Sequence, residues 1–390
     1  MSNPSRQAGS SPHVRNHLKS FRLQKGFSQS ELAARSGLTR QAVSSIESNV
    51  YLPTTGVALQ LASALDCRVE DLFHLADADS MIEGKLVGSL PPYDPSLRTI
   101  RVKVATVGTK TVVRPVTGVG DVLSFTVSTD GYLADVQGVK SGSTVRVKLS
   151  RDRRIIEQEI SVAGCDPAIF LAGEHLRRQK DQTSVVGWTM GSMAALSALQ
   201  QGEVHVAGLH LYDPATGESN LPFLRRALKG SSYEVVTFAT WEEGFLVRLG
   251  NPKSIRSAAD LAEPSVRLVN REEGAGARLL LDQQLHAAGI DSTAVQGYGR
   301  IVLSHFEVAR AIAGQQADVG IGIRSAAQLF GLDFVPVQSA RYDLVVPKPY
   351  LKSHPTLAHL FETLASRPFR SEIEALGGYD THDTGKHHTF

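Results

Sequence analysis

The chain has 390 residues, of which 42% are hydrophobic and 21% are charged, and its formal net charge at pH 7 is +2. The length exceeds one ordinary domain and the composition is that of a globular protein, so two or three domains are expected. The small net charge excludes a strongly basic chain, and any surface that binds nucleic acid must therefore be local.

The number of cysteines and the polar start of the chain indicate the cellular compartment and whether a metal site built from cysteines is expected. The two cysteines, Cys67 and Cys165, lie in segments that look unrelated, which argues against a disulfide framework and against a metal site built from cysteines. No long apolar run follows the start, so no signal peptide or membrane span is predicted. We expect a cytoplasmic protein without metal or cofactor, with disordered tails at residues 1–12 and 382–390.

Residues 13–76 are predicted to form a small helical domain. Apolar residues recur at helical spacing from Val14 and the pattern ends at Gly26, where glycine can close a helix. Ser28 and Glu31 form a capping box that opens a second, short helix, and Thr39 caps a third. Two further helices are predicted around residues 57–65 and 69–73.

The segment RLQKGFSQSELAARSGLTRQAVSSIESNVYLPTTGVALQLASAL resembles the Cro and phage-repressor (XRE) helix-turn-helix family over roughly residues 14–75. The resemblance implies a recognition helix in the major groove of double-stranded operator DNA and a homodimer or higher even assembly. It implies a structural pair of Arg22 and Glu47. The residues expected to contact DNA are Ser28, Gln29, Thr39, Arg40, Gln41, Ser44 and Ser45.

The middle of the chain changes to an alternating pattern. The stretch PPYDPS cannot continue a helix, and residues 77–98 are predicted to be a linker. Residues 99–155 contain IRVKVATV and STVRVKL, which alternate with period two and predict a small β-rich module. A spacer, a dimerisation surface and a part of the sensor remain open as its role.

Residues 156–381 alternate short apolar strands with helical segments, which predicts an α/β domain with largely parallel sheets. Ligands bind beyond the carboxyl ends of such strands. The turns that follow the strands lie at residues 164–166, 189–192, 271–276 and 304–305. We expect them to converge on one crevice.

The stretch NREEGAGARLLL, residues 270–281, suggests what this crevice holds. Glycines at a helix start let an anion approach unpaired N–H groups, and Arg271 and Arg278 can clamp it. The Walker lysine is missing, and Leu279 stands where a third dinucleotide-binding glycine belongs. The candidate ligand-binding residues are Cys165, Thr189, Gly191, Ser192, His210, Arg271, Gly274, Gly276, Arg278, Ser304 and His305.

His205 and His210, with Asp213 nearby, raise a metal-binding alternative. On a regular strand and its following loop, the His-x4-His spacing puts the two imidazoles on opposite faces, so a shared ion is not expected.

The stretch VARAIAGQQADVGIGI resembles the late helix and strand of the type II periplasmic-binding-protein fold. AGCDPA, GSMAALSAL and LVNREEGAGARLLLD resemble the binding-protein-like domain of molybdate-related bacterial regulators. The resemblance implies two lobes, with residues 342–347 as the return crossing between them, and a small oxyanion ligand, molybdate or tungstate first. The fold class expected is multidomain: an all-α helix-turn-helix domain, a β-rich module and a two-lobed α/β domain.

We therefore expect a ligand-responsive transcription regulator. An enzyme that uses the α/β crevice is the first alternative, although G-x-S-x-G, H-E-x-x-H and P-loop motifs are missing from the sequence. A DNA-bound protein that only buffers its ligand is the second alternative.

Overall fold

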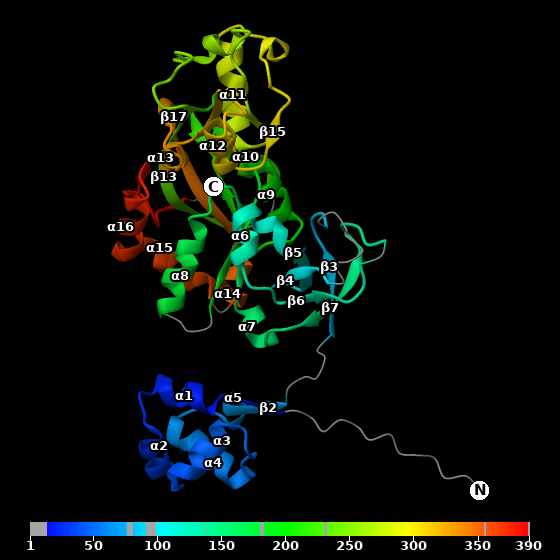
Figure 1. Ribbon diagram of the computed structural model, residues 1–390, viewed down its shortest axis with the longest axis vertical. Helices are drawn as coiled ribbons and strands as arrows, with labels where there is room; N and C mark the ends of the chain where they lie inside the picture. The colour runs from blue at the N-terminus through cyan, green and yellow to red at the C-terminus, as the bar shows by residue number, and fades with distance from the viewer. Residues whose placement is uncertain are drawn as a thin grey trace, which may run out of the picture. The chain divides into compact units, whose positions relative to one another are not determined.

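The computed structural model describes residues 14–75, 81–90, 99–136, 138–179, 183–229, 232–354 and 356–388 (Figure 1). The chain divides into two compact units, residues 1–81 and 82–390, and each is described by itself. The tail expected at residues 1–12 lies outside the described residues. Within the described residues, no helix is both long enough and apolar enough to span a bilayer.

The first unit is a bundle of short helices around one apolar core. Its helices are α1 (Leu18–Gln24), α2 (Gln29–Ser36), α3 (Arg40–Glu47), α4 (Thr55–Leu65) and α5 (Val69–Leu72). The core includes Leu18, Leu32, Val43, Ile46 and Leu61, all fully buried. The predicted caps are confirmed, because Ser28 and Glu31 form a capping box and the Thr39 hydroxyl accepts a hydrogen bond from the Ala42 amide.

The beginning of this unit differs from the prediction of a helix from Val14. Residues Val14–Asn16 form strand β1, which pairs antiparallel with β2 (Phe73–Leu75). Asn16 then ends the strand, since its side-chain oxygen accepts a hydrogen bond from the Leu18 amide at the start of α1. The apolar spacing of this segment is compatible with a helix, but pairing with the end of the unit decides its structure.

The β-rich module is a closed barrel with strand order β3-β5-β4-β6-β7. Its strands are β3 (Met81–Leu86), β4 (Arg101–Val107), β5 (Lys110–Pro115), β6 (Gly131–Leu133) and β7 (Thr144–Leu149). Strand β3 lies inside the segment predicted to be a linker, residues 77–98, and that prediction is wrong there. The strand is needed to close the barrel, where it pairs with β5 in parallel.

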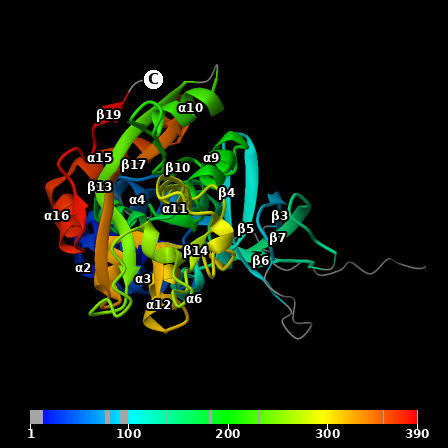
Figure 2. The same cartoon turned by 90° about the horizontal axis from the view of Figure 1, so that it is seen from above.

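Three short helices accompany the barrel. The elements η1 (Val116–Val119) and α6 (Asp121–Thr126) lie between β5 and β6, and α7 (Arg153–Glu157) leads from β7 into the α/β domain. Figure 2 shows the barrel strands at one side of the α/β domain. The two parts are joined by the Arg114–Glu203 ion pair at 3.0 Å and by a hydrogen bond from Thr189 to the Val119 carbonyl.

The main sheet of the α/β domain has the strand order β16-β13-β17-β10-β8-β9. Strands β8 (Ile160–Gly164), β9 (Val185–Thr189) and β10 (Val206–Leu209) run parallel. Strands β13 (Tyr233–Val247), β17 (Asp333–Pro347) and β16 (Val319–Ile323) pair antiparallel. The sheet is therefore mixed, and the prediction of largely parallel sheets holds for only part of it.

Two strands of 15 residues each, β13 and β17, run through the whole domain. One half of this ladder borders β10, and the other half borders β16. We call the part built on β8, β9 and β10 the first lobe, and the part that contains β14 (Asn270–Arg271), β15 (Ile301–Val302) and β16 the second lobe. The crossing expected at residues 342–347 is the end of β17.

Helices cover both lobes, and Figure 1 shows α11 and α12 near one end of the long strands and α8 and α15 near the other. The first lobe carries α8 (Ile169–Gln179), α9 (Ser192–Gln200), α10 (Leu221–Ala227), α14 (Lys348–Ser353), α15 (Leu357–Ala365), α16 (Arg367–Ala375), β11 (Tyr212–Asp213) and β12 (Glu218–Ser219). The second lobe carries η2 (Ala258–Ala262), α11 (Gly276–Ala287), η3 (Ser292–Ala294), α12 (His305–Ala313) and α13 (Arg324–Leu329).

The end of the chain also differs from the prediction of a tail at residues 382–390. Strands β18 (Tyr379–Asp380) and β19 (His387–His388) both pair with β13. The Thr384 hydroxyl donates a hydrogen bond to the Phe238 carbonyl. The segment is held because it continues the edge of the sheet.

Candidate ligand site between the lobes

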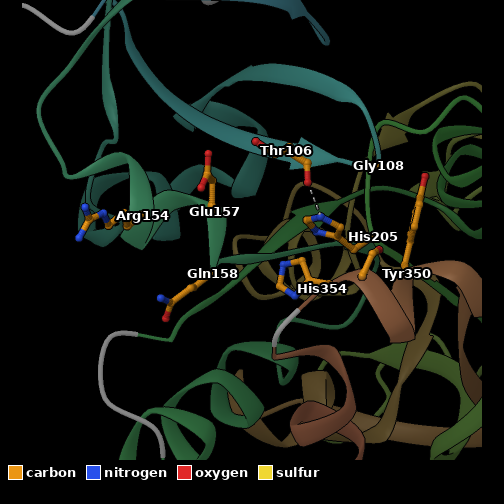
Figure 3. A pocket seen from close by; sticks show the side chains of 9 residues that line it. Thr106, Gly108, Arg154, Glu157, Gln158, His205, Tyr350 and His354 are labelled. Carbon is orange, nitrogen blue, oxygen red and sulfur yellow. Dashed lines mark hydrogen bonds between the residues drawn. The ribbon is translucent and has the colours of Figure 1, made fainter. Parts of the chain in front are cut away.

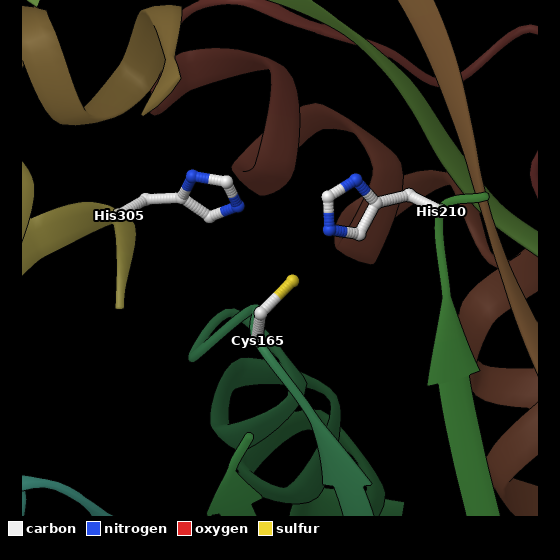
Figure 4. Close-up of side chains that lie close together, drawn as sticks. All are labelled: Cys165, His210 and His305. Atoms are coloured by element: carbon white, nitrogen blue, oxygen red, sulfur yellow. The ribbon is translucent and has the colours of Figure 1, made fainter. Parts of the chain in front are cut away.

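The two lobes meet around three buried side chains, Cys165, His210 and His305. The Cys165 sulfur and one ring nitrogen from each histidine all lie within 4.8 Å of one another, and all three residues are buried. Figure 4 shows the sulfur of Cys165 below the space between the two imidazole rings. Two of the turns predicted to converge, residues 164–166 and 304–305, therefore do meet, and the turn after β10 joins them.

Strand topology explains this meeting. Cys165 directly follows β8 and His210 directly follows β10, and parallel strands end at the same edge of a sheet. His305 is the first residue of α12, whose N-cap Ser304 accepts a hydrogen bond from the Glu307 amide at 3.0 Å. Each side chain thus comes from the end of a rigid element.

We call the place where the lobes meet around Cys165, His210 and His305 the junction. Many buried polar atoms at the junction lack hydrogen-bond partners among the described residues. They are both ring nitrogens of His210, both of His305, Trp241 Nε1, Arg271 Nη1 and Glu243 Oε1. An unsatisfied buried polar group costs about 1–3 kcal/mol. Such a concentration at one place is typical of a ligand site.

Charge at His210 is set by its neighbours. Burial on its own lowers the pKa of this imidazole, but Cys165 and Glu243 outweigh burial and raise the pKa to about 10. His210 Nδ1 lies 3.0 Å from Glu243 Oε1, without the alignment of a hydrogen bond. We infer an imidazolium beside a carboxylate at neutral pH.

His305 has the opposite electrostatic character. Burial, followed by the positive charges of Arg271 and His210, holds the pKa of His305 well below its usual range. This ring is therefore neutral and presents one donor and one acceptor nitrogen.

Asp166 is a buried acid in the same region. Burial raises the pKa of Asp166 to about 6, although hydrogen bonds from the Ala168 amide and the Tyr379 hydroxyl act in the opposite direction.

The two arginines predicted to clamp an anion, Arg271 and Arg278, differ in whether a guanidinium nitrogen remains available to a ligand. Arg271 is 1% exposed and makes two hydrogen bonds to Glu272, at 2.9 and 3.0 Å, while its Nη1 has no partner among the described residues. Arg278 pairs with Asp282 at 3.2 Å and lies 4.0 Å over the Tyr298 ring. Arg271 is therefore the better donor for a ligand.

The remaining candidate ligand-binding residues lie at the junction, where they form hydrogen bonds within the protein or pack closely against other residues. Thr189 donates to the Val119 carbonyl, and the Ser192 hydroxyl accepts from the His210 amide at 3.1 Å. The backbone of Gly274 accepts a hydrogen bond from Met193 across the lobes. A Cβ on Gly276 would lie 2.3 Å from the His210 carbonyl oxygen, and one on Gly191 would lie 2.8 Å from Glu272 Oε1. Contact of any of these residues with a ligand stays a prediction.

Sequence reasoning missed Trp241, Glu243 and Tyr342 as members of the junction. All three lie in the long strands β13 and β17, and the Trp241 and Tyr342 rings stack with centroids 4.7 Å apart. The only available signal was Glu243, a carboxylate inside an apolar strand, which needs a partner when buried.

His205 lies away from the junction, as the spacing predicted. Its Nε2 contacts the Thr106 carbonyl at 2.9 Å and its Nδ1 accepts from the Ser161 amide at 3.0 Å. It borders a hollow of about 450 Å³ between barrel and first lobe, lined also by His354 and Tyr350 (Figure 3). Both ring nitrogens of His205 are engaged, and in this lining only Nε2 of His354 is a buried polar atom without a partner among the described residues, against seven such atoms at the junction, so this hollow is the weaker ligand site.

The predicted DNA-facing residues fall into two groups. Arg40 and Gln41 are exposed at the start of α3, whereas Ser44 and Ser45 are half-buried along it. Gln29 is turned inward and donates to Glu47 at 2.9 Å. The Arg22–Glu47 pair has Nε and Oε1 2.6 Å apart and side chains that are 8% and 3% exposed, as expected of a structural pair.

Comparison with known proteins agrees with this division. A helix-turn-helix family matches residues 18–72, and the PBP superfamily domain matches residues 173–365. YvgK of Bacillus subtilis is 36% identical over 227 residues, which are 58% of this chain and 72% of YvgK. The HTH-type transcriptional regulator YgzD of Bacillus subtilis is 36% identical over 64 residues, which are 16% of this chain and 97% of YgzD.

A distant likeness to solved structures also exists. The tungstate ABC transporter protein of Geobacter sulfurreducens aligns with 13% identity and a TM-score of 0.43, over 56% of this chain and 98% of that protein.

Proposed function

Since the chain belongs to the XRE-type helix-turn-helix transcriptional regulators and carries a C-terminal ligand-binding domain of the periplasmic-binding-protein superfamily, we propose that a small oxyanion between the lobes sets its affinity for DNA. The observation that carries the proposal is the set of unpartnered buried nitrogens at the junction. Trp241 Nε1 and Arg271 Nη1 can only donate, and His210 is held as an imidazolium. A ligand rich in acceptors fits these groups.

The negative charges near the junction are mostly compensated. Glu243 faces His210, and Glu272 is paired with Arg271. An anion that enters would therefore meet hydrogen-bond donors at Arg271 Nη1 and His210 whose neighbouring carboxylates are already paired, in a setting of low dielectric where charge-assisted hydrogen bonds are strong. Molybdate and tungstate are the first ligands to test.

Closure of two lobes around a ligand is a known way to move attached domains. A ligand that favours one DNA-binding state by about 1–3 kcal/mol changes operator affinity by roughly 5- to 150-fold, and DNA must change ligand affinity by the same factor. A protein that only buffers its ligand would bind the oxyanion with no such change.

The test is calorimetry of the full-length protein with molybdate, tungstate, sulfate and phosphate. Phosphate also tests whether Glu243 accepts a hydrogen bond from the ligand. Hydrogen phosphate carries an O–H donor, which molybdate, tungstate and sulfate lack when fully ionised. We expect Arg271→Lys to weaken binding of the best ligand about tenfold or more, because the planar fork is lost. Arg278→Lys is the matched control and should leave binding unchanged. Failure of every oxyanion to bind would contradict the proposal.

A further inference from the structure

The junction also contains a set of donors that suits a cation. A sulfur and two imidazole rings are the donors that Zn²⁺ and similar borderline-soft metals prefer. Cys165 brings the sulfur and His210 and His305 bring the imidazoles, from three separate segments and with atoms within 4.8 Å of one another. Bond lengths of about 2.1 and 2.3 Å in a tetrahedral site put such atoms roughly 3.3–3.7 Å apart. Movement of about 1 Å would complete the set.

The surroundings of His210 resemble those of a metal-binding histidine. Such a histidine almost always directs its second ring nitrogen at a carboxylate or carbonyl, which fixes the ring. Glu243 Oε1 lies 3.0 Å from Nδ1 of His210. Figure 4 shows the opposite edge of the ring turned toward Cys165 and His305. The Glu243 carboxylate is itself held, since Gln338 donates to its other oxygen at 3.0 Å.

Both rings are fully buried, and none of their nitrogens has a hydrogen-bond partner among the described residues. A histidine in the apolar core usually satisfies at least one nitrogen, as His205 does.

We propose that Cys165, His210 and His305 bind one divalent cation of the Zn²⁺ class, with the sulfur as thiolate. Binding displaces the thiol proton and the proton on the ligating nitrogen of His210, and both protons leave to solvent. Cys165 and His210 belong to the first lobe and His305 to the second, so the ion holds the lobes together. The earlier expectation of no metal site considered His205 as the partner of His210, and the fold supplies His305 instead.

This inference goes beyond the oxyanion and does not depend on it: in the metal-bound state His210 is a neutral ligand and no longer the imidazolium of the oxyanion proposal. Three protein ligands leave a fourth position open. A water molecule or an oxyanion oxygen can fill that position, and Arg271 Nη1, which has no partner among the described residues, is available to donate to it.

The experiment uses full-length protein stripped with a chelator and titrated with Co²⁺, followed by competition with Zn²⁺. We expect one Co²⁺ per chain, with the absorption of a thiolate-to-cobalt charge transfer. Cys165→Ser should abolish this absorption, and His305→Gln should weaken binding at least tenfold. The matched controls are Cys67→Ser and His286→Gln, which change the other cysteine and an exposed histidine. Both should behave as the parent.

A milder variant keeps the test independent of folding. Glu243→Gln should retain the charge-transfer absorption and lower the affinity about 10- to 100-fold, because only the orientation of His210 is disturbed. Absence of Co²⁺ and Zn²⁺ binding, or absorption that survives in Cys165→Ser, would overturn the proposal. Oxyanion calorimetry on stripped and Zn²⁺-loaded protein separates the two proposals, since oxyanion binding to stripped protein without any Co²⁺ signal would refute only the metal site.

Discussion

Replacing Gly164 by alanine should destabilise the second unit through a clash with a single atom. A Cβ on Gly164 would lie 2.1 Å from the Tyr342 hydroxyl oxygen, whereas the next atoms, Tyr342 Cζ and Gly208 Cα, are 3.3 and 3.4 Å away. Tyr342 is 1% exposed and stacks on Trp241, so its hydroxyl cannot move into solvent. Overpacking of this kind costs about 1–3 kcal/mol of the free energy of unfolding.

The clash predicts a specific rescue. Tyr342→Phe removes the offending oxygen, so Gly164→Ala should cost less in the Tyr342→Phe background than in the parent. Gly208→Ala is the matched control: its Cβ would lie 1.9 Å from the same oxygen but also 2.3 Å from Cζ, which phenylalanine keeps. Tyr342→Phe should therefore fail to rescue Gly208→Ala.

Urea unfolding followed by tryptophan fluorescence measures these differences. The chain has two tryptophans, Trp188 and Trp241, and both lie in the second unit, so the signal omits the DNA-binding unit. Parent-like stability of Gly164→Ala, or equal rescue of both glycine variants, would refute this account of the packing between β8, β10 and β17.

Other predictions concern DNA binding, assembly and pH. Arg40→Ala and Gln41→Ala should each reduce discrimination between operator and random duplex by about 1–3 kcal/mol, and unchanged specificity ratios would refute the assignment. Arg22→Ala should lower the stability of the DNA-binding unit by about 3–5 kcal/mol, because Glu47 stays buried without its guanidinium; unchanged melting with lost DNA binding would make Arg22 a contact residue. Sedimentation should show a dimer or higher even assembly, and a monomer that binds a palindromic site tightly would contradict this. Burial, followed by the charge of His354, lowers the pKa of His205 to about 4, below its unfolded value. The native state therefore resists protonation, and stability should fall as pH drops from about 6.5 toward 4, with about 2 kcal/mol lost at pH 5; a pH dependence unchanged in His205→Gln would refute this.

The DNA-binding unit could be predicted well because its signals are local. The Ser28–Glu31 capping box and the Thr39 cap act within three residues of sequence, and the structure contains both. Strand β1 was missed because its partner β2 lies near the far end of the unit. Propensity cannot report such a pairing, since the partner strand, and not the local sequence, supplies its hydrogen bonds.

The junction could be predicted from its strand ends but not from its strand middles. Cys165, His210 and His305 follow strands or begin a helix, where sequence reasoning looks for ligands. Trp241 and Glu243 reach the same place only because β13 runs through both lobes. Likewise, β3 could not be distinguished from a linker, because its role depends on closing a barrel with β5 and β7.

The central claim is that a ligand between the lobes controls DNA binding. The most direct test measures the operator affinity of the full-length protein at fixed salt, with and without the oxyanion that binds best in calorimetry, for the parent and for Arg271→Lys. We predict that the oxyanion changes the operator affinity of the parent by roughly 5- to 150-fold. In Arg271→Lys, the same change should need at least about tenfold more oxyanion. Oxyanion binding that leaves the operator affinity of the parent unchanged would contradict the claim.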